Sequence, residues 1–165
     1  MRRMLKLLLA GLLFSLSPCM GASISPIGTV YDVSAMNLLQ DPNGFADLRW
    51  GEPLTAIQES HRTKLAGYQS GTAAYHVLVP DAHNSVYFIG PVIVRAVFMD
   101  NRLVGIIIPF SKEDFDQRLH GMTKLFGNPE KTNSTFYTWK GPFSVIILTE
   151  LNDNGIIMLT AKPKN

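Results

Sequence analysis

The sequence predicts an α+β domain with a mainly antiparallel sheet of about seven or eight strands, one long amphipathic helix over about 112–126 and one short helix over about 53–60. Two observations predict this class. Short apolar, β-branched runs alternate with turn residues along most of the chain, as in strands joined by tight turns. The segments with helical spacing do not alternate regularly with these runs, which argues against a parallel α/β fold.

The first half of the predicted domain contains the short helix and several strands. Residues 45–50 predict the first strand, which ends at Gly51, and the short helix follows over 53–60. Residues 61–71 are polar and irregular, which predicts a loop. The runs at 73–79 and 85–89 are rich in β-branched and aromatic residues and predict two further strands.

A β-hairpin is predicted next. The apolar runs 92–99 and 102–110 are separated only by Asp100 and Asn101, which tolerate the positive φ of a two-residue turn. Regular alternation then places these pairs on one face: Phe98 with Leu103, Ala96 with Gly105, and Val94 with Ile107. The opposite face is also largely apolar, which predicts either shelter by a second layer of loops or a docking surface for another protein.

The most regular pattern in the chain predicts the long helix. Four apolar side chains recur at helical spacing and form one stripe: Phe115, Leu119, Met122 and Phe126. Ser111 is a suitable N-cap with Asp114 at the capping-box position, and Gly127 suits the position after the last helical turn. The pattern therefore predicts a helix that lays this stripe on the sheet.

Three strands are predicted after this helix, over 135–140, 143–150 and 155–161. Residues 152–155 have the composition of a hairpin turn rather than of a calcium loop, because the downstream glutamate of a calcium loop is missing. Each predicted helix is thus followed by meandering strands, which is a faint duplication without a residue-level repeat.

The N-terminal segment has the composition of a secretory signal peptide. A basic start precedes an apolar run over 7–16, and small residues follow, with cleavage expected next to Gly21 or Ala22. The run is shorter than the roughly 20 residues that a membrane-spanning helix needs. The chain is therefore predicted to consist of a signal peptide over 1–22, a leader over 23–44 and a single α+β domain over 45–165.

Cys19 is the single cysteine of the chain, which excludes an intrachain disulfide. It follows Leu16, Ser17 and Pro18 in a stretch that resembles a bacterial lipobox, although Pro18 stands where that pattern has a small residue. Soluble export to the periplasm or the medium is the favoured prediction, and membrane attachment is predicted only if Cys19 is lipidated.

The basic character of the chain belongs largely to its N-terminus. The formal net charge is +2, from 15 Lys and Arg against 13 Asp and Glu. Three basic residues, Arg2, Arg3 and Lys6, would leave with the signal peptide, so the remaining chain would carry a net charge of −1. We therefore expect no nucleic-acid partner.

Two stretches carry a resemblance to known proteins. Trp50-Gly51 precedes the short predicted helix, and Gly127-Asn128-Pro129 follows the long one, with Tyr137-Thr138-Trp139-Lys140-Gly141 in the next strand. This layout resembles small exported bacterial α+β domains of unknown function and is similar to the β-lactamase-inhibitor-like fold, which includes small outer-membrane assembly lipoproteins. The resemblance implies an exported, non-enzymatic binding or assembly role and implies no site residues.

Candidate binding residues are aromatic. Tyr137 and Trp139 lie on one face of a predicted strand, where they either cover the core beside Phe126 or form a stacking platform for a partner. The predicted working surface is either a face of the sheet or the loops around Trp50, Tyr68 and Trp139.

A metal site is the alternative. His76, Asp81 and His83 lie close together in the sequence, and two imidazoles with a carboxylate can bind zinc or iron, although no dedicated metal-binding spacing is present. Polar turn residues with solvated imidazoles are the plainer interpretation.

The sequence carries no recognisable catalytic set: it has no Gly-x-Ser-x-Gly motif and no phosphate-binding glycine loop before a helix. We therefore expect an exported protein of the bacterial envelope that acts as a non-enzymatic binding or assembly module without a cofactor. Its partner would be another envelope or extracellular protein, or a second copy in a homodimer. The alternative is a small periplasmic metal-dependent hydrolase that uses His76, Asp81 and His83.

Overall fold

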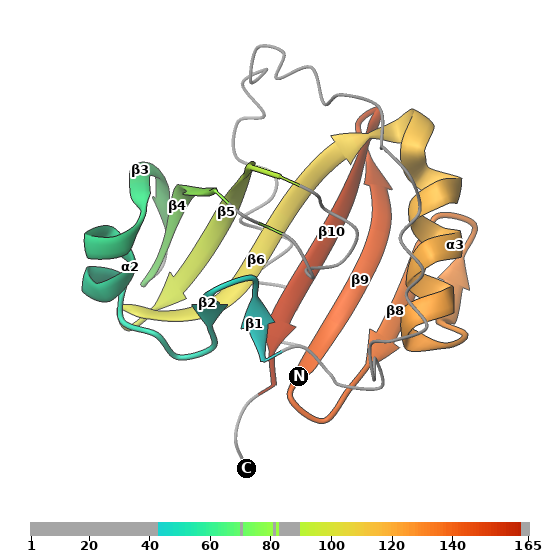
Figure 1. Ribbon diagram of the computed structural model, residues 1–165. Helices are drawn as coiled ribbons and strands as arrows, with labels where there is room; N and C mark the ends of the chain where they lie inside the picture. Colours follow the sequence, from blue (N-terminus) through green and yellow to red (C-terminus); the bar gives the residue numbers. More distant parts are fainter. Residues whose placement is uncertain (1–42, 70, 81, 83–89, 163–165) are drawn as a thin grey trace. The chain divides into compact units, whose positions relative to one another are not determined.

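The fold is an antiparallel eight-stranded sheet with two helices, seen in a computed structural model (Figure 1). The structure describes residues 43–69, 71–80, 82 and 90–162, all of which belong to one unit, residues 33–165. The α+β class and the mainly antiparallel sheet are confirmed. None of the helices in the described ranges has the length and hydropathy needed to cross a membrane.

The two halves of the described chain have the same order of elements, one helix followed by four strands. The first half contains α2 (Leu54–Ser60), β3 (Arg62–Gln69), β4 (Thr72–Val79), β5 (Val92–Met99) and β6 (Arg102–Ser111). The second half contains α3 (Phe115–Phe126), β7 (Glu130–Asn133), β8 (Phe136–Lys140), β9 (Ser144–Leu151) and β10 (Asn154–Ala161). The sheet order β3-β4-β5-β6-β10-β9-β8-β7 joins the two meanders through their last strands.

Each meander ends in a hairpin of the predicted kind. The β5–β6 turn has positive φ at Asp100 (50°) and Asn101 (58°), and the β9–β10 turn has positive φ at Asn152 (47°) and Asp153 (64°). Such two-residue turns match the right-handed twist of the strands that they connect. Both hairpin predictions are therefore confirmed, and the strands β6 and β10 lie at the centre of the sheet.

A β-bulge changes the predicted register of the first of these hairpins. Phe98 pairs with Leu103 as expected, but the register shifts beside it, so Ala96 pairs with Ile106 rather than Gly105. The prediction was wrong beyond this point because regular alternation cannot anticipate one extra residue in a strand. The shift turns Ile106 toward the main core and leaves Ile107 on the opposite face.

The predicted strands differ from the structure at three further places. Residues 61–71 do not form a loop, because most of this stretch is β3, which pairs with β4 along its length. Residues 45–50 form two very short paired strands, β1 (Gly44–Phe45) and β2 (Leu48–Arg49), instead of one. The strand β7 was not expected at all, and the predicted strand at 85–89 lies outside the described residues.

The second helix is shorter and starts differently from the sequence prediction. The helix α3 spans 12 residues and follows a single 3-10 turn over Lys112–Asp114. Neither Ser111 nor Asp114 makes a side-chain capping hydrogen bond, so the predicted capping box is absent. Phe115 and Met122 are buried, while Leu119 and Phe126 are partly buried against the core.

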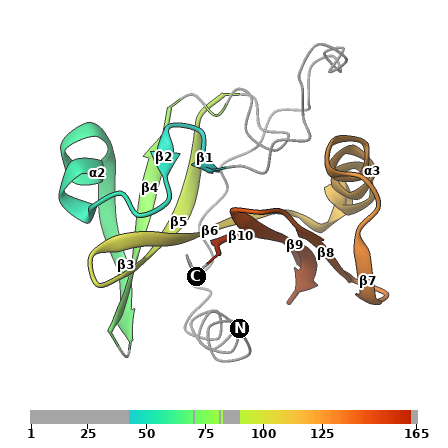
Figure 2. The same ribbon diagram turned by 90° about the horizontal axis from the view of Figure 1, so that it is seen from below.

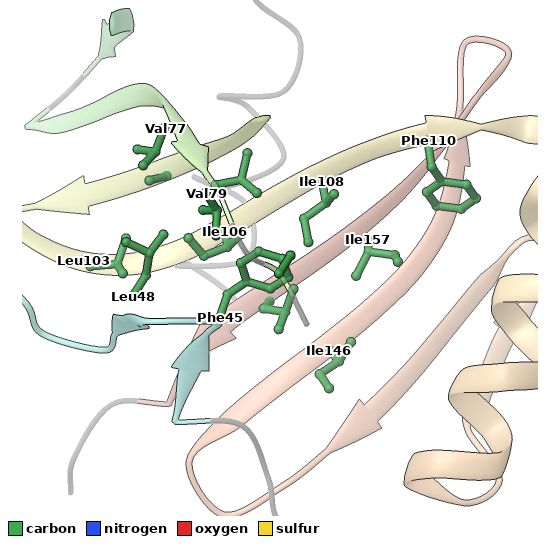
Figure 3. Packing of buried hydrophobic residues seen from close by; sticks show 14 of the residues in the cluster. Phe45, Leu48, Val77, Val79, Leu103, Ile106, Ile108, Phe110, Ile146 and Ile157 are labelled. Atoms are coloured by element: carbon green, nitrogen blue, oxygen red, sulfur yellow. The ribbon is translucent and has the colours of Figure 1, made fainter. Parts of the chain in front are cut away.

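Both helices and the β1–β2 hairpin lie on the same face of the sheet (Figure 2), which we call the helix face. The main core lies on this face, where Phe45 of β1 packs among β-branched side chains of the central strands (Figure 3). The buried side chains drawn from the central strands include Ile106, Ile108, Ile157 and Ile146.

The side chain of Phe110 connects α3 to the sheet. Its ring stacks on Phe115 at 6.4 Å between centroids, and the guanidinium of Arg118 lies 5.7 Å from its centroid. A Cβ atom on Gly155 of β10 would lie 2.2 Å from the Phe110 ring, so the absence of a side chain there admits the ring. Burial lowers the pKa of Arg118, and the nearby Asp114 carboxylate partly opposes this shift.

Candidate functional site

One residue from each of the eight strands forms a transverse row on the face opposite α2 and α3, which we call the open face because neither of these helices covers it (Figure 2). The register runs Lys64, His76, Arg95, Ile107, Met158, Ile147, Thr138 and Glu130 from β3 to β7. Successive side chains in a strand point to opposite faces, and the neighbours of His76, Tyr75 and Val77, pack with the helix-face core. The row therefore lies on the other side of the sheet.

The centre of this row is apolar and buried. Ile107, Met158 and Ile147 are 7%, 2% and 2% exposed, respectively, yet none of them belongs to the main core cluster. They form a second apolar layer on the open face of the central strands. This agrees with the prediction from sequence that the β5–β6 hairpin has two apolar faces.

The β3–β5 end of the row is basic. Arg62 and Lys64 on β3 are exposed, and His76 on β4 and Arg95 on β5 are half-buried. We call these four residues the basic patch. No Asp or Glu occurs in any of the strands β3 to β6, and no residue of the patch forms an ion pair within the described ranges.

The electrostatic environment of His76 reflects this lack of carboxylates. Burial lowers the pKa of His76 below its ordinary value of 6.5, and the positive charges of Arg95 and Lys64 lower it further. Both neighbours are its direct cross-strand partners. The two cations, in strands that contain no Asp or Glu, favour the binding of a negatively charged group at this end of the row.

The predicted metal-binding residues are only partly described. His76 is in the basic patch, whereas Asp81 and His83 lie outside the described residues. Within the described ranges, no group of three or more His, Cys, Asp or Glu side chains is arranged to hold a metal ion. The two cations beside His76 oppose the binding of a further cation at its imidazole.

The aromatic pair on β8 packs on the helix face. Trp139 is 5% exposed, its Nε1 donates a hydrogen bond to the Gly127 carbonyl oxygen at 2.8 Å, and its ring lies 6.5 Å from that of Phe126. Tyr137 is half-buried beside Phe115, with a ring centroid distance of 6.0 Å. These contacts correspond to the core-covering interpretation of the pair.

The other two aromatic candidates lie elsewhere. Trp50 is half-buried against the core just after β2, and Tyr68 is 73% exposed on β3. The strands β3 and β8 are near opposite ends of the sheet, so the structure does not bring Tyr68 together with Tyr137 and Trp139.

A serine, a histidine and an aspartate meet at the end of α2. His61 Nδ1 lies 2.8 Å from Ser60 Oγ, and His61 Nε2 lies 3.0 Å from Asp47 Oδ2 without hydrogen-bond alignment. Ser60 Oγ donates to the Ala56 carbonyl oxygen at 2.9 Å, an ordinary interaction of serine in a helix. Because the His61 side chain is only 6% exposed, this group acts as a structural link between the β1–β2 turn and α2.

An open depression of about 590 Å³ lies beside the start of α3. Its walls are mostly acidic, with Glu113, Asp116 and Asp153 around an ion pair between Lys112 and Glu150 at 3.2 Å. It lies on elements distant from the basic patch and shares no residue with it.

Sequence reasoning missed the basic patch as a unit. Charge was considered over the whole chain, and residues 61–71 were expected to form a loop, so Arg62 and Lys64 had no predicted face. The signal that would have found it is the absence of Asp and Glu from four successive strands that contain basic residues.

Comparison of the chain with protein-family models, with curated proteins and with solved structures gives no match. The resemblance to small exported domains and to the β-lactamase-inhibitor-like fold therefore remains an expectation from sequence.

Proposed function

We propose that the chain is an exported binding or assembly module of the bacterial envelope, without catalytic activity of its own, and that its basic patch binds an acidic region of a partner. The observation that carries this proposal is that the two cations Lys64 and Arg95 lie on either side of His76 in neighbouring strands, with no carboxylate among them. Clustered charge of one sign favours association with the opposite sign.

Export is supported by the sequence of the N-terminus. A basic start, an apolar run over 7–16 and small residues near Gly21 and Ala22 are typical of a signal peptide. In this proposal residues 1–22 are removed, residues 23–44 form a leader and residues 45–165 form the working domain, in the periplasm or outside the cell.

The segment 112–126 is proposed to act as one amphipathic unit that seals the helix face at the second meander. Support comes from burial of Phe115 and Met122 on one side and exposure of Asp116 and Lys124 on the other. This unit would leave the basic patch, at the β3–β5 end of the opposite face, as the working surface.

Cell fractionation and mass spectrometry of the mature N-terminus test the export part. We expect the protein in the periplasmic or extracellular fraction with a new N-terminus near Gly21 or Ala22. Full-length protein recovered only from the cytosol would overturn it.

Charge reversal tests the binding part. An oligoglutamate peptide should bind the wild-type chain in calorimetry, with an affinity that falls as salt rises. Arg95→Glu should weaken it by about tenfold or more, because one attraction becomes a repulsion. Lys124→Glu, an exposed position on α3, is the matched control and should bind like wild type. Equal loss in both variants, or no binding at all, would contradict the proposal.

A further inference from the structure

The strand β3 is an edge of the eight-stranded sheet with an unusual surface. It is eight residues long, and within the described ranges no strand pairs with its outer side. The opposite edge, β7, has only four residues, and Glu130 of β7 is paired with Lys140 of β8. The edge that offers a long backbone ladder is therefore β3.

The side chains of β3 differ between the two faces of the sheet. Arg62 and Lys64 are exposed on the open face, next to Leu78 and His76 of β4. Leu65 and Tyr68 lie on the helix face, opposite Tyr75 and Ala73, with 57% and 73% exposure.

Edge strands that merely avoid aggregation carry charge and bulges and lack large exposed apolar groups. The bulge between Leu65 and Gly67 and the two cations fit that role. The exposed Leu65 and Tyr68 do not, because they leave apolar surface in water along an edge that pairs with no other strand of the described part of the chain. Their exposure is explained if another strand covers them.

We infer that β3 accepts an extended segment of an acidic partner protein as a ninth strand of the sheet. The added strand would place carboxylates beside Arg62 and Lys64 on the open face and apolar side chains beside Leu65 on the helix face. Alternation of acidic and apolar residues is therefore the sequence pattern that fits this edge. The side chains of β3 fit such an alternating segment best over Arg62–Leu65, before the bulge.

Charge decides between an acidic partner and a second copy of the chain. A second copy would bring another β3, with the same two cations and no carboxylate to offset them. Like charges on adjacent strands are destabilising, whereas opposite charges stabilise the pair. The geometry therefore points to a partner segment rich in Glu or Asp.

This inference rests on the proposed acidic partner, but it adds a distinct binding mode that a separate probe tests. The probe is a peptide of about ten residues with alternating Glu and Val, long enough to span β3. A peptide of the same composition with its Glu and Val residues in two blocks is the control. We expect the alternating peptide to bind more tightly by about tenfold, since only it presents each residue type to one face.

Variants of the chain locate the contact. Leu65→Ser with Tyr68→Ser should weaken binding of the alternating peptide by about tenfold and leave oligoglutamate binding unchanged. Phe143→Ser, at another exposed large side chain outside β3, is the matched control. Bound alternating peptide should also slow hydrogen exchange of β3 backbone amides, and that readout does not depend on the variants folding.

The outcomes separate the two proposals. Strand addition is wrong if oligoglutamate binds through Arg95, the alternating peptide binds no more tightly than the block peptide, and the β3 amides stay unprotected. The proposed function as a binding module would then still hold. If neither peptide binds in a charge-dependent way, both proposals fail. If sedimentation shows a dimer that the combined Leu65→Ser and Tyr68→Ser variant no longer forms, the occupant of the β3 edge is a second copy of the chain rather than an acidic partner.

Discussion

Arg95 on β5 and His76 on β4 are direct cross-strand partners on the face of the sheet opposite the helices, and Lys64 is the partner of His76 on its other side. No strand from β3 to β6 contains a carboxylate that would offset these charges. The imidazole therefore lies between two fixed cations, and its titration reports on the basic patch.

Acidification should destabilise the wild-type chain through His76. Its pKa is below 6.5 in the folded state because of burial, Arg95 and Lys64, whereas the unfolded chain has the ordinary value. The contribution of His76 to the free energy of unfolding is complete above about pH 6.5, and it is lost as the pH falls through the lower pKa of the folded state. The urea midpoint should therefore fall more for wild type than for His76→Gln between about pH 7.5 and 5. Parallel decreases in the two proteins would show that His76 is not responsible.

Removing a neighbouring cation should raise the pKa of His76. Arg95→Gln and Lys64→Gln each remove one of the two repulsive charges, so an NMR titration should give higher values than in wild type. The value should stay below the ordinary one in either variant, because burial is the largest cause of the shift. Lys124→Gln on α3 is the control. An unchanged titration in both variants would mean that the cations lie too far from the imidazole to act.

Trp139→Phe should destabilise the fold. The substitution removes a donor to the Gly127 carbonyl oxygen and part of a buried ring beside Phe126. We expect a loss of about 1–3 kcal/mol in the free energy of unfolding. The matched control is Tyr137→Phe, whose hydroxyl donates only to the exposed Ser134 carbonyl oxygen. That change should cost less than about 0.5 kcal/mol. Similar losses at both positions, measured by urea unfolding, would contradict the role given to Trp139.

Gly155→Ala should also destabilise the fold, through overpacking. The new Cβ would meet the Phe110 ring at 2.2 Å, and that ring is already stacked on Phe115. We expect a cost of about 1–3 kcal/mol in the free energy of unfolding. Gly67→Ala is the matched control, since a Cβ at this strand position meets no atom within 4 Å. A neutral Gly155→Ala would show that the Phe110 ring moves aside without cost.

Much of the fold was predictable because its determinants are local. The two-residue turns at 100–101 and 152–153 depend on residues that tolerate positive φ, and both hairpins form there. Phe115 and Met122 are buried because helical spacing turns both toward the sheet. Export, the leader and the absence of catalytic activity are also sequence inferences, and they remain predictions.

Other features depend on contacts that are distant in the sequence. The strand β3 has little strand character of its own and exists because β4 pairs with it, and the bulge in the β5–β6 hairpin shifts the face of every residue beyond it. The basic patch draws its members from three strands, so no local window contains it. The sequence alone determined the turns, the periodicities and the export pattern, because these depend on neighbouring residues. Only the tertiary structure decided which side chains share a face, because strand register is set by long-range pairing.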